Sequence, residues 1–371
     1  MHRRTVLAAL LATGVAAGVS VAGSAGASAA TAAYTVTDLG TLGNISSSGG
    51  GLNNGGQVSG ASAAQAVTIP AGAPGCPPHY GVLKPCVEHP SHAFLYSGGV
   101  MTDLGTLGGL SSAATAINAT GSAVGSAATA AGVSHAFVER GGVMTDLGTL
   151  DGAAASSNAL AINGTGQIVG WSTAAGGTGN HAFLDTNGTM IDLGTIDGGT
   201  ASVANGINAS GVVIGNSDTA ASDEHGFVYQ NGTMTDIGTL GGPNSSVDAI
   251  NDNGVVAGSS QDAADVSHPV VYSNGKLTSL GTYNIDTTPQ AINDNGVIVG
   301  TTYGVTAAGL PFNDAYIYQG GTFQDLNNLI PMGSGWQLTD AVAININGQI
   351  LVDATNTATG QSHALLLNPA G

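Results

Sequence analysis

Histidine and aspartate recur eleven residues apart along this sequence of 371 residues. Both residue types can act as general acids or bases, and both can bind a metal ion. The pairs are His92 with Asp103, His135 with Asp146, His181 with Asp192, and His225 with Asp236. A catalytic site needs one such pair, whereas this chain repeats it. We therefore interpret the pairs as structural hydrogen bonds that brace each repeat, and we assign no catalytic residue.

Both cysteines, Cys76 and Cys86, lie in an irregular segment at about residues 61–90. Together with His79 and His89 they form a C-x2-H-x6-C-x2-H pattern that could bind zinc. Two cysteines alone in an exported protein usually pair, so we expect a disulfide and no metal or other cofactor. Because loops on rigid scaffolds often carry function, His79, Glu88 and His89 are candidate binding residues.

Two further residues break the repeat and are candidate binding residues. Asp314 replaces the histidine of one repeat, where it is expected to face Asp325. Trp336 lies in a longer connection, where its ring could either stack on a carbohydrate or pack in the core. The Asn-Asp-Asn-Gly turns at 251–254 and 293–296 are rich in oxygen ligands for calcium, but turn chemistry explains the same residues without a metal.

The elements that must position these side chains are repeats of 43–46 residues, apart from one step of 65 residues that contains the irregular segment. Each repeat has three markers. An Asp-Leu-Gly or a variant begins at residues 38, 103, 146, 192, 236, 279 and 325. An asparagine that usually follows Ala-Ile stands at residues 53, 118, 163, 208, 251, 293 and 345. His-Ala-Phe or a variant begins at residues 92, 135, 181, 225, 268, 314 and 363.

Each repeat reads as four short strands separated by Asn-x-x-Gly, Gly-Gly or Asn-Gly turns. This period is typical of a β-propeller blade. The segment 34–40 reads as a fourth strand without a third, and 363–367 reads as a third strand without a fourth. We therefore predict an all-β, seven-bladed propeller with four-stranded blades, closed by pairing of the N-terminal and C-terminal strands. A β-solenoid is the alternative.

One repeat is also similar to a known family. The segment HAFLYSGGVMTDLGTLGGLSSAATAINATGSAVG, at residues 92–125, closely resembles the repeat of the HAF family of bacterial extracellular repeat proteins. The similarity extends over residues 34–367. It implies a secreted or surface location. It implies no catalytic residues, because the family has no established activity.

Residues 1–29 have the features of an export signal, with a basic start, an apolar stretch at 5–21 and a small-x-small site at Ala27-Ser28-Ala29. Arg3 and Arg4 resemble a twin-arginine signal. A membrane anchor is the alternative, but no second long apolar run follows. We expect residues 30–371 to be a single secreted propeller domain, with an insertion at 61–90 in its first blade and no membrane insertion after cleavage.

Charge limits the partners of the mature chain. After loss of the signal, three basic residues remain against 23 acidic ones, a net charge of −20. Such a surface repels nucleic acid and anionic lipid. We expect a monomeric, non-catalytic binding or scaffold module for an extracellular protein or glycan. The alternative is an enzyme that acts on a polysaccharide at the tunnel mouth, which requires that the residues breaking the repeat converge there.

Overall fold

Strands make up nearly all of the secondary structure in the computed structural model, which describes residues 32–43, 45–69, 86–176, 179–281, 286–305 and 311–371. Within these ranges, two 3-10 turns, η1 (Ile196–Gly198) and η2 (Leu326–Asn328), are the helical elements. No helix in the described part of the chain is long and apolar enough to cross a membrane. The predicted signal at 1–29 lies outside the described residues.

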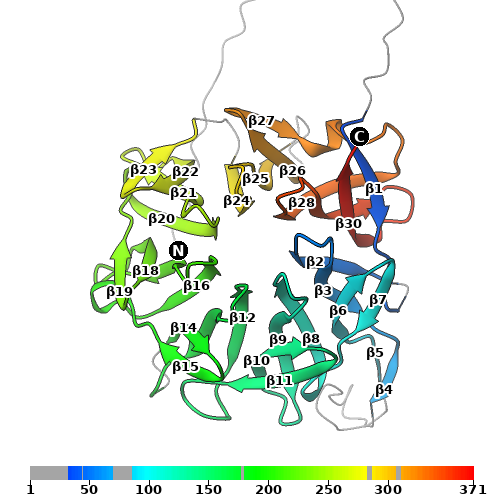
Figure 1. The fold of residues 1–371 in the computed structure, drawn as a ribbon, viewed down its shortest axis with the longest axis horizontal. Helices are drawn as coiled ribbons and strands as arrows, with labels where there is room; N and C mark the ends of the chain where they lie inside the picture. Colours follow the sequence, from blue (N-terminus) through cyan, green and yellow to red (C-terminus); the bar gives the residue numbers. More distant parts are fainter. Residues whose placement is uncertain (1–31, 44, 70–85, 177–178, 282–285, 306–310) are drawn as a thin grey trace, which may run out of the picture. The chain divides into compact units, whose positions relative to one another are not determined.

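Seven antiparallel, four-stranded sheets follow one another around a ring (Figure 1). The first blade contains β2 (Ser47–Leu52), β3 (Val58–Ala63), β6 (Ser91–Ser97) and β7 (Val100–Asp103). The second contains β8 (Gly108–Ile117), β9 (Ala123–Thr129), β10 (Ser134–Arg140) and β11 (Val143–Gly148). The third contains β12 (Ser157–Ile162), β13 (Ile168–Thr173), β14 (Asn180–Thr186) and β15 (Thr189–Asp192). The first strand named in each blade is the innermost one.

The remaining blades repeat this order. The fourth blade contains β16 (Ser202–Ile207), β17 (Val213–Asp218), β18 (Glu224–Gln230) and β19 (Thr233–Asp236). The fifth contains β20 (Gly241–Ile250), β21 (Val256–Asp262), β22 (Ser267–Ser273) and β23 (Lys276–Ser279). The sixth contains β24 (Asp286–Ile292), β25 (Ile298–Val305), β26 (Pro311–Gln319) and β27 (Thr322–Asp325). In the first blade, β4 (Val67–Ile69) and β5 (Cys86–Glu88) pair as a separate two-stranded sheet.

The seventh blade is built from both ends of the chain. It contains β28 (Trp336–Ile344), β29 (Ile350–Asn356) and β30 (Ser362–Pro369), and its outer strand is β1 (Tyr34–Asp38). β1 and β30 are antiparallel, with Tyr34 opposite Pro369, and Figure 1 shows them side by side in blue and red. The predicted seven-bladed propeller and its closure by the two terminal strands are confirmed, and the solenoid alternative is wrong.

A bulge in the innermost strand explains why the second strand of most blades contains a glycine. In the third blade the pairing shifts between Ala159 and Ala161. This brings the Asn158 carbonyl against the neighbouring strand, and a Cβ added to Gly170 would lie 2.0 Å from that oxygen. The seventh blade has Val352 at the equivalent position, and its innermost strand carries a second register shift. The geometry of each bulge therefore selects the residue opposite it.

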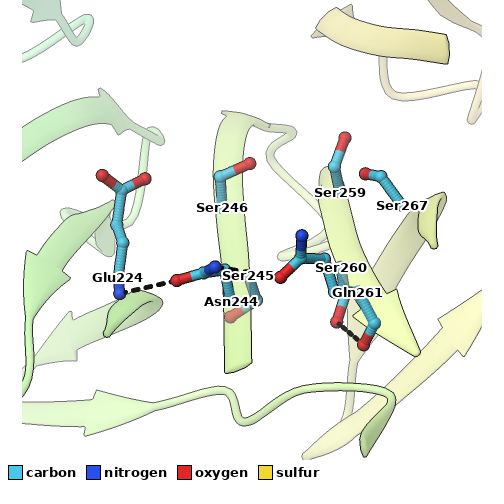
Figure 2. A pocket seen from close by; sticks show the side chains of 8 residues that line it. All are labelled: Glu224, Asn244, Ser245, Ser246, Ser259, Ser260, Gln261 and Ser267. Atoms are coloured by element: carbon cyan, nitrogen blue, oxygen red, sulfur yellow. Dashed lines mark hydrogen bonds between the residues drawn. The ribbon is translucent and has the colours of Figure 1, made fainter. Parts of the chain in front are cut away.

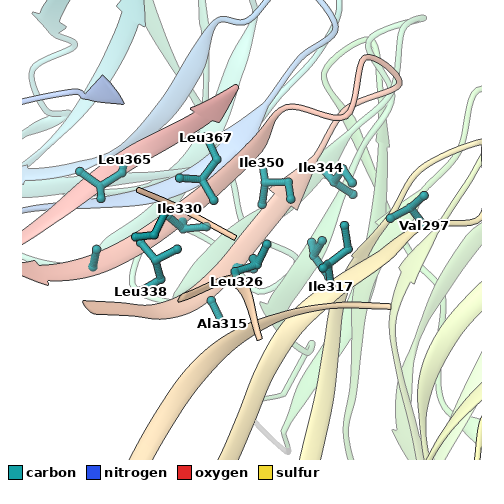
Figure 3. Close-up of a cluster of buried hydrophobic side chains, with 14 residues drawn as sticks. Val297, Ala315, Ile317, Leu326, Ile330, Leu338, Ile344, Ile350, Leu365 and Leu367 are labelled. Carbon is teal, nitrogen blue, oxygen red and sulfur yellow. The ribbon is translucent and has the colours of Figure 1, made fainter. Parts of the chain in front are cut away.

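The hydrophobic core is a series of clusters, each shared by neighbouring blades. Figure 3 shows the largest, where Ile317 of the sixth blade meets Leu338, Ile350 and Leu365 of the seventh. The phenylalanines of the His-Ala-Phe segments are fully buried in the equivalent clusters. Because each blade buries its faces against its neighbours, the blades depend on one another for stability.

The marker asparagines link all seven blades into a ring. Each side-chain amide donates to the backbone carbonyl of the next marker asparagine, over 3.0–3.3 Å. The donors, in order around the ring, are Asn53, Asn118, Asn163, Asn208, Asn251, Asn293 and Asn345, and the last donates to Asn53. The asparagine oxygen meanwhile accepts backbone N–H groups of its own turn, as Asn208 does from Val212. One side chain thus holds a turn and joins two blades.

A serine at the start of the innermost strand joins neighbouring blades at the opposite edge. The Ser157 hydroxyl accepts the backbone N–H of Ala136 over 2.8 Å and donates to the carbonyl of Gly148 over 2.6 Å. Equivalent serines in other blades make the same links. The residues on either side of this serine therefore lie at the boundary between two blades, at the edge of the ring opposite the asparagine turns.

Candidate functional site

The predicted His–Asp pairs are hydrogen bonded in the structure. The four Nδ1–carboxylate distances are 2.7–2.9 Å. A fifth pair, His363 with Asp38 at 2.9 Å, joins the two terminal strands. In the hairpin, Phe183 is directly opposite Asp192, so His181 is its diagonal neighbour on the same face. Each aspartate also accepts the N–H of the glycine two residues later. The pair therefore stabilises the turn that follows the strand.

Two of the predicted binding residues are described at the end of the excursion of the first blade. Glu88 ends β5, His89 follows it, and both are exposed. His79 lies outside the described residues, as does Cys76. The disulfide between Cys76 and Cys86 therefore stays a prediction, and so does its zinc alternative. No group of three metal-binding side chains occurs within the described ranges.

The predicted turn chemistry is seen at both Asn-Asp-Asn-Gly segments. The Asp252 carboxylate accepts the backbone N–H of Ala209 over 2.8 Å, and Asp294 accepts that of Asp252 over 2.9 Å. Each aspartate therefore binds the preceding blade. Its carboxylate acts as an inter-blade link at the asparagine edge of the ring.

Trp336 and Asp314 occupy adjoining blades but have different surroundings. The Trp336 indole is partly buried, with its ring centre 5.3 Å from that of His363, and it packs against the largest hydrophobic cluster. This favours the packing interpretation of Trp336. Asp314 instead lines an open groove between the sixth and seventh blades. The residues that break the repeat therefore do not all converge, since Glu88 and His89 belong to the first blade.

The groove beside Asp314 has a volume of about 530 Å³. Its walls come from the start of β26 and the start of β28. The lining residues are Phe312, Asn313, Asp314, Gln337 and Thr339. A hollow of about 220 Å³ adjoins it, shares Phe312 and Asp314, and reaches inward to Tyr316, Phe323 and Asp325. An aromatic face, two amides, a hydroxyl and a carboxyl group therefore meet in one place.

Asp314 is held in the groove wall by amide donors. The Gln337 side-chain amide donates to its Oδ1, and the Asn327 amide lies 3.4 Å from the same atom. Burial raises the pKa of Asp314, the negative charge of Asp325 raises it further, and the hydrogen bond from Gln337 opposes both. The carboxyl group is therefore fixed in position, and its surroundings favour the protonated form more than water does.

Aromatic residues gather in the sixth blade. The Phe312 ring covers Gly304 on the paired strand so closely that a Cβ there would lie 2.7 Å from it. Phe323 packs against Tyr316 and Tyr318, with ring centres 5.0 and 4.6 Å apart. The rings form a rigid apolar wall beside the polar groups.

Sequence reasoning found Asp314 but missed Phe312, Gln337 and Thr339. Asp314 is recognisable because it replaces a recurring histidine. The other three are unremarkable in sequence, and Gln337 is 23 residues away from Asp314 on another blade. The available signal was the aromatic enrichment of the sixth repeat.

Two largely buried carboxyl groups lie close to the boundaries between blades. Asp353 is directly opposite Asp340 in the seventh blade and accepts the Gly49 N–H of the first blade over 2.7 Å. Burial raises the pKa of Asp353 to about 7, with a smaller contribution from the charge of Asp340. Asp340 accepts the Gln290 side-chain amide of the sixth blade over 2.7 Å. The pair therefore links three consecutive blades.

Asp248, on the innermost strand of the fifth blade, is the second such group. Burial raises its pKa to about 7, and the charge of Glu224 on the fourth blade contributes. Its Oδ2 is buried and has no hydrogen-bond partner among the described residues. A carboxyl group in these surroundings favours its neutral form.

Comparison with known proteins supports the fold alone. No protein-family model matches this sequence, and no curated protein matches it significantly. The β-propeller domain of the trilobed protease from Pyrococcus furiosus aligns with 88% of this chain and 94% of its own length, with a TM-score of 0.51 and 9% identity. The Pyrococcus horikoshii acylaminoacyl peptidase aligns with 87% of this chain, with a TM-score of 0.51 and 8% identity.

A third similar structure is TolB from Acinetobacter baumannii, at 12% identity and a TM-score of 0.39 over 76% of this chain. The chain spans 51% of the P. horikoshii peptidase and 60% of this TolB. The described chain is a seven-bladed β-propeller protein, and identities this low carry no activity over from these structures.

Proposed function

We propose that this protein is a secreted, monomeric, non-catalytic module of the HAF-repeat type, and that it binds a neutral glycan in the groove between its sixth and seventh blades. The observation that carries the proposal is the meeting of the Phe312 ring with Asn313, Asp314 and Gln337 in one open groove. This groove lies where the His-Ala-Phe segment is replaced. The export signal expected at 1–29 supports the secreted location.

The chemistry of the groove suits a sugar ring. The apolar C–H face of a sugar packs against an aromatic face, as Phe312 offers. Amide and carboxyl groups can bind neighbouring hydroxyl groups, because together they offer both donors and acceptors. The groove is open, so it suits a segment of a polymer better than a small molecule that needs enclosure.

The charge of the protein selects among glycans. The mature chain carries a net charge of −20, which disfavours uronic acids and sulfated sugars. Both carboxyl groups of the groove region, Asp314 and Asp325, add to the negative potential there. A neutral glycan is therefore the expected ligand.

Hydrolysis of a polysaccharide is the alternative, with Asp314 as acid and Asp325 as base. The raised pKa of Asp314 favours it. Against it, the Asp325 carboxylate accepts the Asn327 backbone N–H over 2.8 Å and two side-chain amides, which hold it in the turn at η2. Binding is better supported because these three hydrogen bonds already hold Asp325 in the turn. Release of reducing ends from a bound glycan would overturn the non-catalytic proposal.

A glycan array probed with the purified mature protein tests the proposal. We expect binding to neutral glycans, weakened about tenfold or more by Phe312→Ala, since an aromatic contact contributes about 1 kcal/mol and its apolar area adds to that. Asn180→Ala is a control for a substitution outside the groove, because Asn180 is exposed on the third strand of another blade. Absence of binding to every neutral glycan, or equal binding by Phe312→Ala, would refute the proposal.

A further inference from the structure

A second, smaller groove lies on the fifth blade at its boundary with the fourth. It has a volume of about 150 Å³ and is lined only by polar residues. Figure 2 shows Glu224 on one side, Asn244 and Ser246 on the middle strand, and Ser259 and Ser267 on the other side. The groove offers hydrogen-bonding groups throughout and no aromatic wall.

The two grooves occupy equivalent places in the repeat. Glu224 and Asn313 each precede the residue at the histidine position of their blade. On the innermost strand of the next blade, Ser245 pairs with Ser260 and Leu338 pairs with Ala354, so Ser245 and Leu338 are at equivalent positions. Asn244 and Gln337 are the residues just before them. Ser246 and Thr339 follow in the same order. Each groove therefore includes the third strand of one blade and the innermost strand of the next, and the second groove also extends over β21 and the start of β22 in the fifth blade.

The residue types at these positions single out the two grooves. We compare two positions at each boundary, that of Glu224 and Asn313 on the third strand and that of Asn244 and Gln337 on the next innermost strand. At the other five boundaries, at least one of these two residues is serine or alanine. The pairs there are Ser362 with Ser46, Ser91 with Ser111, Ser134 with Ser156, Asn180 with Ala201, and Ser267 with Asp286. Only the boundaries between blades four and five and between blades six and seven carry an amide or carboxyl side chain at both positions. Side chains that can bind hydroxyl groups thus stand at both positions of these two boundaries.

Some polar groups of the second groove bind one another, and others remain available to a ligand. The Asn244 amide is fixed, because its oxygen accepts the Glu224 backbone N–H over 3.0 Å and its nitrogen donates to Gln261 over 2.9 Å. The Glu224 carboxylate and the hydroxyls of Ser246 and Ser267 have no hydrogen-bond partner among the described residues, and the first and last of these residues are exposed. Free acceptors and hydroxyls on a fixed frame suit the hydroxyl groups of a sugar.

Both grooves open at the same edge of the ring. Each includes the start of an innermost strand, whereas the ends of these strands meet in the ring of asparagine turns at the opposite edge. Two blades separate one groove from the other. A flexible polymer can therefore reach both grooves on one molecule.

We propose that the groove between the fourth and fifth blades is a second subsite for the same neutral glycan, so that the protein binds a polysaccharide bivalently. This inference rests on the proposed function of the first groove. The second subsite binds through hydrogen bonds alone and is the weaker of the two. Its contribution is seen with a polymer, because the second contact becomes intramolecular once the first is made.

The test compares a polymer with its short fragment. Neutral polysaccharides such as laminarin, dextran and mannan are immobilised, and the matching trisaccharide is titrated in solution. The variants are Glu224→Ala with Asn244→Ala in the second groove, and Phe312→Ala in the first. The control, Ser134→Ala with Ser156→Ala, changes the same two positions at the boundary of blades two and three.

For the second-groove variant we expect a loss of tenfold or more in apparent affinity for the polymer, and no change for the trisaccharide. Phe312→Ala should weaken both, and the control should weaken neither. Ser267→Leu, which fills the second groove without removing a hydrogen bond, should reproduce the loss for the polymer. This keeps the test valid if the double variant unfolds.

The two proposals fail in different ways. If the second-groove variants bind the polymer within twofold of the unaltered protein while Phe312→Ala loses it, the second subsite is refuted and the proposed function stands. If the unaltered protein binds none of the polysaccharides, the proposed function itself is refuted.

Discussion

Replacing Asp353 by asparagine should stabilise the protein at neutral pH and remove part of its pH dependence. The side chain lies between blades seven and one, where its Oδ1 accepts the Gly49 N–H over 2.7 Å. Burial and the nearby charge of Asp340 raise its pKa to about 7 from an ordinary 3.8. Asparagine keeps the oxygen acceptor and, like the protonated acid, carries no charge.

The magnitude follows from the difference between the two pKa values. Between about pH 4 and pH 7 the folded protein holds a proton on Asp353 that the unfolded chain has released. Stability therefore falls as pH rises through this window and levels off above it. Three pH units correspond to about 4 kcal/mol, since each unit is worth about 1.4 kcal/mol. The stability of the unaltered protein relative to Asp353→Asn should fall by that amount from pH 4 to pH 8.

Guanidinium unfolding at intervals from pH 4 to pH 8 measures this difference. The net charge also makes the fold less stable as pH rises, but that effect is shared by both proteins and cancels in the comparison. Asp265→Asn is the control, because it removes the same charge from an exposed turn whose positive φ of 59° asparagine tolerates. If the curves of the unaltered protein and Asp353→Asn run parallel over the whole range, the reasoning about burial is refuted.

Three further substitutions test the packing of the ring. Asn208→Ala removes the link to the next blade and leaves the Ser210 and Val212 N–H groups without their acceptor, so unfolding in guanidinium should show a loss of about 3 kcal/mol. Gly170→Ala should cost about as much because of the 2.0 Å approach, whereas Gly164→Ala, with open space around it, should change the melting temperature little. His363→Ala should loosen the strand that closes the ring, which faster amide exchange in residues 34–38 would show. Unchanged exchange there would contradict this role.

The architecture could be predicted from the sequence because its repeated markers reflect the local geometry of turns and hairpins. Asn187-Gly188 adopts positive φ at both positions, which defines a two-residue hairpin turn and hence the diagonal register of His181 and Asp192. The offset between the first and last strands indicated how the ring closes. These features depend on neighbours in one hairpin or on counting repeats, and both can be read from the chain itself.

The role of the marker asparagine could not be read in this way. Its recurrence and its turn were evident, but its side-chain amide binds a blade more than 40 residues further along the chain. The same holds for the serine that joins neighbouring blades at the other edge. Contacts of this kind depend on the angle between blades, and no local pattern specifies that angle.

The candidate site shows the same division. The sequence alone marked Asp314 as a residue that breaks the repeat, and it indicated an acidic propeller. Only the tertiary structure placed Phe312 and Gln337 on either side of it and revealed an equivalent groove beside Glu224. The physical reason is that register within a hairpin is set by turns of two residues, whereas a groove between blades exists only once the ring has closed and brought two separate sheets together.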